Sequence, residues 1–153
     1  MSDRIVLLFP PDSAKPYREF EAIGSLLPPM GVASMAACLR QQGFPVSLID
    51  GMAEGLGVDE AVERILAADP AVLGVSMVSA VVFLSDEIAR KVKERKPSVL
   101  VVVGGAHVSA VPEETMTRMR HFDIGVIGEG EETIVELARA LKASGGRPSD
   151  LGR

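Results

Sequence analysis

The stretch that decides the fold runs from Val99 to Glu132. It opens with the apolar run Val99-Leu100-Val101-Val102-Val103, which ends on Gly104-Gly105, and it closes with the run Ile124-Gly125-Val126-Ile127, which ends on Gly128-Glu129-Gly130. Short apolar runs bounded by glycine are typical of buried parallel strands. The glycines therefore mark the carboxyl ends of two strands, which form the edge where open α/β sheets bind ligands.

The rest of the chain repeats the same alternation of strands and helices. Apolar runs predict three earlier strands, and apolar stripes at helical spacing predict the helices between them. The expected strands span residues 4–9, 46–49, 72–77, 99–103 and 124–127, and the expected helical stripes span residues 32–39, 58–66, 81–92, 112–119 and 134–141. About twenty residues between Pro10 and Pro29 show no periodicity, and a loop of that length is usually functional or mobile.

Five such units predict an α/β fold with helices on both faces of a parallel sheet. We expect a flavodoxin-like (Rossmann-like) three-layer sandwich, with five parallel strands in the order 2-1-3-4-5. Residues 1–145 would form this single domain.

Composition excludes several classes of partner. The chain has 153 residues, a net charge of −5 and a pI near 5.1, and it has no basic stripe, which argues against nucleic acid. No apolar run is long enough to cross a membrane, and the start of the chain does not resemble a signal peptide. Cys38 is the single cysteine, which suits a reducing cytoplasm. We expect Cys38 to be a structural thiol.

Several nucleotide and phosphate sites are absent from the sequence. The first strand is followed by Pro10-Pro11, with no Walker-type or dinucleotide glycine motif and no hydroxyl-rich phosphate loop. Gly128-x-Gly130 imitates part of a dinucleotide motif, but the glutamates around it would repel a pyrophosphate. A receiver domain would need acidic residues after the first strand and an aspartate at the end of the third, where this chain has Phe9-Pro10 and Ser76.

Four loop motifs, each at a strand end or helix start, carry a family resemblance. They are Pro28-Pro29-x-Gly31, Ser76-x-x-Ser79, Gly104-Gly105-x-His107-Val108 with Pro112-Glu113-Glu114, and Gly128-Glu129-Gly130-Glu131-x-Thr133. In this order the chain resembles the N-terminal cobalamin-binding domain of cobalamin-dependent radical SAM proteins, over nearly its whole length.

The resemblance implies a corrin on the carboxyl edge of the sheet, with the nucleotide tail running between strands past glycines that leave it room. The implied cofactor-binding residues are Ser76, Met77, Val78, Ser79, Gly104, Gly105, His107, Val108, Gly128, Glu129 and Gly130. No residue of this chain is assigned a catalytic or metal-ligating role.

The resemblance also implies a longer parent enzyme, a methyltransferase or a related carbon-skeleton enzyme. A radical SAM barrel with a 4Fe-4S cluster and S-adenosylmethionine would then be the partner of this domain, and residues 146–153 would begin the linker to it. An alternative stays open, in which the chain is a degenerate flavodoxin-like module that binds a small ligand or another protein without cobalamin.

One departure from related cobalamin domains concerns the cobalt ligand. Methionine-synthase-type domains carry D-x-H-x-x-G after the first strand, whereas Pro10-Pro11-Asp12-Ser13-Ala14 contains no histidine. We therefore expect no protein imidazole on cobalt. His107 is expected to hydrogen-bond locally or to touch the corrin edge, and His121 to be a surface or packing residue. Gly104-Gly105 could also be no more than a turn, and Glu131 is expected to be a helix N-terminal acid.

Overall fold

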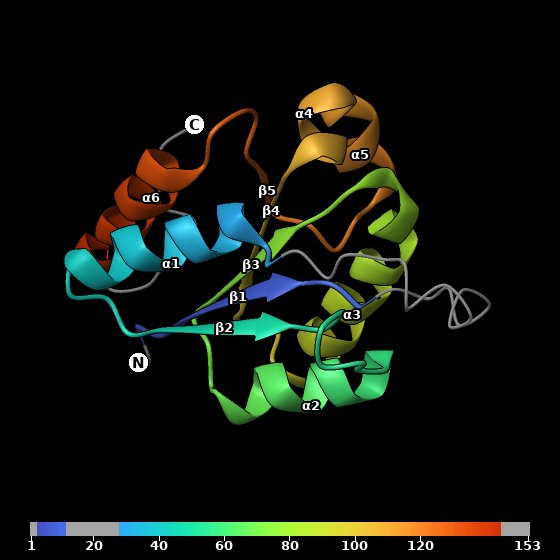
Figure 1. Ribbon diagram of the computed structural model, residues 1–153, viewed down its shortest axis with the longest axis horizontal. Helices are drawn as coiled ribbons and strands as arrows, with labels where there is room; N and C mark the ends of the chain where they lie inside the picture. The colour runs from blue at the N-terminus through green and yellow to red at the C-terminus, as the bar shows by residue number, and fades with distance from the viewer. Residues whose placement is uncertain (1–2, 12–27, 145–153) are drawn as a thin grey trace.

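A five-stranded parallel sheet forms the middle layer of the molecule (Figure 1). The computed structural model describes residues 3–11 and 28–144. The strand order β2-β1-β3-β4-β5 and the parallel pairing are those predicted from the sequence. The strands are β1 (Ile5–Phe9), β2 (Val46–Asp50), β3 (Val72–Ser76), β4 (Leu100–Gly104) and β5 (Ile124–Gly125).

Two pairs of helices cover the two faces of this sheet. Helices α1 (Met30–Gln41) and α6 (Glu131–Ala143) lie together on one face, and α2 (Val58–Ala67) and α3 (Val82–Arg95) lie on the other (Figure 1). Successive strand residues point to opposite faces, so Leu7 enters the α1/α6 core while Leu8 enters the α2/α3 core. The predicted three-layer sandwich is therefore confirmed. Cys38 packs half-buried in the α1/α6 core, as a structural thiol should.

The predicted helices begin where the sequence places acidic or capping groups. The N–H of Gly57 donates to the carboxylate of Glu60 at 2.8 Å at the start of α2, which satisfies one of the donors that a helix start leaves unpaired. Glu113 and Glu114 lie in the first turn of α5 (Pro112–Arg118), and Glu131 lies in the first turn of α6, as predicted. Carboxylates are stabilised there by the positive end of the helix dipole.

Two segments differ from the sequence-based expectation. A short helix, α4 (Ala106–Ala110), forms directly after Gly105, and its five residues are too few for an apolar stripe to reveal it. The fifth strand was predicted over residues 124–127, but only Ile124–Gly125 pair as strand, with Val102 and Val103. β5 has a single neighbour, and the chain leaves the sheet there to cross toward α6.

Asp123 completes the edge of the sheet that this short strand leaves incomplete. Its Oδ2 accepts the N–H of Val101 at 2.7 Å and lies 2.7 Å from Nζ of Lys93. The backbone N–H of Asp123 donates to the carbonyl of Val101 at 2.9 Å. The carboxylate thus replaces the strand partner that Val101 lacks and ties the edge to α3.

Two expectations fall outside the described residues. They concern most of the long segment between Pro10 and Pro29, and the linker expected over residues 146–153. Among the helices of residues 3–11 and 28–144, none is long and apolar enough to cross a membrane.

Replacing Asp123 with alanine should lower the free energy of unfolding by about 1–3 kcal/mol, because a partly buried N–H and an ammonium both lose their acceptor. Urea unfolding followed by circular dichroism measures the change. The matched control is Glu94→Ala, which removes an exposed i,i+4 pair with Arg90 and should cost less than about 0.5 kcal/mol. Equal losses in the two variants would contradict the role of Asp123.

Candidate functional site

The sheet face under α1 and α6 is hollow at its carboxyl end, because the side chains there are small. Leu7, Gly74 and Val102 stand side by side on β1, β3 and β4, so the central member of this row has no side chain. In the next row toward the carboxyl edge, Ser76 stands beside Gly104. Large apolar residues fill the same face nearer the amino end, where Val72 and Leu100 are buried.

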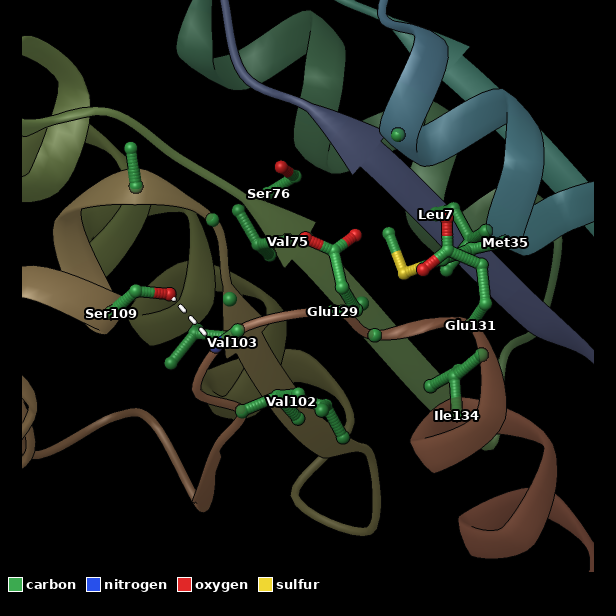
Figure 2. A pocket seen from close by; sticks show the side chains of 18 residues that line it. Leu7, Met35, Val75, Ser76, Val102, Val103, Ser109, Glu129, Glu131 and Ile134 are labelled. Carbon is green, nitrogen blue, oxygen red and sulfur yellow. Dashed lines mark hydrogen bonds between the residues drawn. The ribbon is translucent and has the colours of Figure 1, made fainter.

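The helices leave matching room on their side. Gly31 and Met35 lie one turn apart on α1, and Gly130 and Ile134 have the same spacing at the start of α6, so each pair shares one helix face. Together with the small residues of the sheet they enclose a cavity of about 430 Å³ that opens at the carboxyl edge (Figure 2). A space of this size falls in the range of small-molecule sites.

The cavity is apolar inside and polar at its mouth. Leu7 and Val102 in its floor are 1% and 4% exposed. Ser109 at the mouth accepts the N–H of Gly128 at 3.0 Å, which holds the β5–α6 segment beside α4. Glu129 and Glu131 extend over the cavity from this segment (Figure 2). A ligand would therefore bury an apolar group inside and keep polar groups at the edge.

Gly105 lets the ends of β3 and β4 come close together. Its φ of +95° lies in the region that favours glycine. A Cβ there would lie 2.7 Å from the carbonyl oxygen and 2.9 Å from the nitrogen of Met77. The same backbone is fixed by two hydrogen bonds, because the N–H of Met77 donates to the carbonyl of Gly104 at 3.0 Å and the N–H of His107 donates to the carbonyl of Met77 at 3.3 Å. Gly105 is therefore needed for the protein's own packing.

A second group of residues forms a ledge beside the cavity. Ser79 Oγ and His107 Nδ1 are hydrogen-bonded at 2.9 Å, joining the turn after β3 to α4. Val78 beside them is 48% exposed. We call Val78, Ser79 and His107 the ledge. His121 lies on the loop before β5, where its Nδ1 contacts Oδ1 of Asp86 in α3 at 3.0 Å.

The sequence-predicted site residues divide between these two places. Ser76, Gly104, Gly105, Gly128, Glu129 and Gly130 line the cavity, and Val78, Ser79 and His107 form the ledge. Met77 and Val108 are buried in the α2/α3 core, so their side chains support the site from beneath.

Sequence reasoning missed the interior of the cavity. Gly31, Met35 and Ile134 were assigned only to a loop motif or to helix stripes, and Gly74 was passed over inside a strand. A single glycine within an apolar strand often marks a close approach of a ligand or another backbone, and this signal could have identified Gly74.

A doubly wound parallel sheet with an apolar cavity at its carboxyl edge defines an α/β ligand-binding domain. The family model described as the B12 binding domain matches residues 20–138. The chain therefore belongs to the B12-binding domain family, which confirms the cobalamin-binding resemblance seen in the sequence.

Two similar proteins are much longer than this chain. An uncharacterized methyltransferase of Pyrococcus horikoshii is 34% identical over 138 residues, which cover 90% of this chain and 29% of that protein. An anaerobic magnesium-protoporphyrin IX monomethyl ester cyclase of Synechocystis is 32% identical over 146 residues, covering 91% of this chain and 28% of that protein. The chain thus spans less than a third of these relatives.

Solved structures confirm the flavodoxin-like fold. A CheY-like protein of Pseudomonas aeruginosa superposes with a TM-score of 0.57 at 12% identity, over 88% of this chain and 98% of that one. The receiver domain of NtrC4 from Aquifex aeolicus gives 0.55 at 13% identity, over 94% and 99%. At this identity the likeness concerns the fold alone.

Two glycines at the site should respond differently to alanine. In Gly74→Ala the new Cβ meets only the end of the Leu7 side chain, at 2.7 Å, and Leu7 can turn into the cavity. We expect its free energy of unfolding to change by less than about 1 kcal/mol, since alanine also lowers the backbone entropy cost of a strand glycine. Gly105→Ala meets backbone at positive φ and should lose about 1–3 kcal/mol. Urea unfolding of both variants measures this, and a larger loss for Gly74→Ala would contradict the described cavity.

Proposed function

We propose that the cavity between β1, β3, β4 and the two helices α1 and α6 holds the nucleotide tail of cobalamin, and that the corrin lies on the ledge and the carboxyl edge of the sheet. The observation that carries the proposal is the cavity itself, because glycines stand where side chains would otherwise fill it. Gly74 and Gly130 let Leu7 and Met35 pack directly against the backbone, since a Cβ would lie 2.7 Å and 2.9 Å from them, and a Cβ on Gly31 would meet no atom within 4 Å. Membership of the B12-binding domain family supports it.

The polar groups at the mouth suit the outer parts of such a ligand. A corrin carries amide side chains and the tail carries a ribose, so the site needs hydrogen-bond donors and acceptors more than positive charge. The carboxylates of Glu129 and Glu131 can accept from amides and hydroxyls, and the hydroxyl of Ser76 can donate or accept. These residues would orient the cofactor, while the apolar floor excludes water from its tail.

The ledge would support the corrin without binding its cobalt. His107 is held by Ser79 through Nδ1, and this hydrogen bond fixes the direction of the ring. The sequence contains only two histidines, neither of them in the loop after β1, and His121 contacts Asp86 of α3. We therefore keep the expectation that no imidazole of this chain ligates cobalt.

The chemistry would come from the cofactor and from further parts of a longer enzyme. Cobalamin supplies a transferable methyl group or one-electron cobalt chemistry when it is bound. We propose that residues 1–145 are the cobalamin domain of a cytoplasmic radical SAM enzyme, and that residues 146–153 lead to a barrel carrying a 4Fe-4S cluster and S-adenosylmethionine. Support comes from the greater length of the relatives and from the methyltransferase among them. Cys38 alone cannot hold such a cluster.

Binding of hydroxocobalamin tests the site most directly. The purified chain is mixed with hydroxocobalamin, desalted, and examined for retained corrin absorbance, in air and under reducing conditions. Gly31→Leu should lower retention at least tenfold, because the new side chain projects into the open mouth of the cavity, where no atom lies within 4 Å of a Cβ. Its free energy of unfolding should rise by about 0.5–1 kcal/mol, since leucine favours a helix more than glycine does.

The control for this variant is Ser34→Leu, at an exposed position of the same helix that does not line the cavity. It should bind like the unaltered chain. Absence of retained corrin in the unaltered chain would argue for the alternative, a flavodoxin-like module without cobalamin. Normal binding by Gly31→Leu would show that the cofactor lies elsewhere.

The cobalt ligand can be examined by electron paramagnetic resonance of the bound Co(II) form. We expect no nitrogen hyperfine splitting from a protein ligand, because the loop after β1 has no histidine. Nitrogen-15 labelling of the protein separates a protein nitrogen from one of the cofactor. A splitting that responds to the label and disappears in His107→Ala would overturn this expectation.

A further inference from the structure

The interior of the cavity differs in polarity from its mouth. Leu7, Val102, Met35 and Ile134 surround the notch at Gly74, and none of these side chains has a group that donates a hydrogen bond. The backbone around Gly74 is also engaged, because β3 pairs with β1 on one side and with β4 on the other. A group that enters the notch therefore finds almost no hydrogen-bond partner.

The polar residues lie where they would meet the invariant part of the ligand. Ser76, Ser109, Glu129 and Glu131 are all at the carboxyl edge, where the corrin is proposed to lie. In every natural cobamide this outer part of the tail is a ribose phosphate, whose phosphate can accept from the hydroxyls of Ser76 and Ser109 while its ribose hydroxyl can donate to a glutamate, and only the terminal base differs. Discrimination between cobamides can therefore come only from the apolar interior.

From this arrangement we infer that the chain selects its corrinoid by the lower base, and that it takes an apolar base such as dimethylbenzimidazole or cresol in preference to adenine. Adenine carries an amino group and three ring nitrogens that the notch would leave unpaired. A buried polar group without a partner is costly, whereas the methyl groups of the apolar bases gain from burial. The inference rests on the proposed function, since it assumes that the tail enters the cavity.

Affinities for four corrinoids test the inference. Equilibrium dialysis of the 153-residue chain is followed by the visible absorbance of cobalamin, cresolyl cobamide, adenine cobamide and cobinamide, which has no base. The cresolyl form is the main probe, because its base does not coordinate cobalt and needs no release before binding. We expect it to bind at least tenfold more tightly than adenine cobamide, a difference of about 1.4 kcal/mol. Cobinamide should bind most weakly.

A pair of variants tests whether the preference for cresol over adenine arises in the cavity. Val102→Thr places a hydroxyl in the floor at nearly constant volume, and we expect the preference for cresol over adenine to fall at least threefold. The control is Val101→Thr, the adjacent residue of β4, which is buried against α2 and α3 on the opposite face. It should leave the preference unchanged. The release of adenine from cobalt is the same in all three proteins, so it cancels in the comparison.

Each outcome bears on a different claim. Equal binding of cresolyl and adenine cobamides, both tighter than cobinamide, overturns the selection but keeps the tail in the cavity. Equal binding of cobinamide and cresolyl cobamide would show that the tail does not enter the cavity, and absence of all binding overturns the proposed function. If Val102→Thr does not fold, Met35→Gln introduces a polar group from the half-buried helix side and is judged by the same ratio.

Discussion

Close packing is the constraint on which this structure depends, and Gly74 is where it is relaxed. Protein interiors normally fill to the density of organic crystals. Gly74 lies on the central strand between Leu7 and Val102, and even one added carbon would lie 2.7 Å from Leu7. The cavity exists because small residues stand on both of its sides, with Gly74, Ser76 and Gly104 on the sheet and Gly31 and Gly130 at the helix starts.

The opposite face of the sheet is closely packed. Helices α2 and α3 bury a continuous aliphatic core there. Their outer surfaces are joined by ion pairs, among them Lys91 with Asp59 at 2.6 Å, where the hydrogen bond raises the pKa of Lys91. Such exposed pairs add little stability individually. The packed core therefore carries the stability of this face, which leaves the α1/α6 face free to hold a cavity.

The sequence predicts the sheet better than it predicts the site. Alternating apolar runs and stripes indicated all five strands, because periodicity reports burial directly. Their order was predicted from the common winding of five such units. Gly104, Gly105 and Gly128 were found because they follow strands. Gly74 was missed because β3 reads as an ordinary buried strand, and only its register beside Leu7 shows that it forms a floor.

Other parts of the site could not be predicted because they depend on tertiary contacts. The hydrogen bond between Ser79 and His107 joins residues 28 positions apart, and no local sequence pattern predicts it. Helix α4 is too short to have a periodic stripe, and the early end of β5 follows from its single neighbour. Met35 and Ile134 look like core residues in the sequence, and they are distinguished only by the glycines that face them across the cavity.

The likeness to receiver domains shows how far a shared fold can serve different chemistry. Both place their sites at the carboxyl edge of a sheet in the order 2-1-3-4-5. A receiver site needs acidic residues after the first strand and an aspartate at the end of the third, so that charge gathers at the edge. Here Phe9-Pro10 and Ser76 occupy those positions, so these strand ends carry no carboxylate, and Ser76 lines the cavity instead. The difference lies in a few residues at strand ends and in Gly74 within β3, which here leave an apolar cavity open at the edge in place of a cluster of carboxylates on the strand ends.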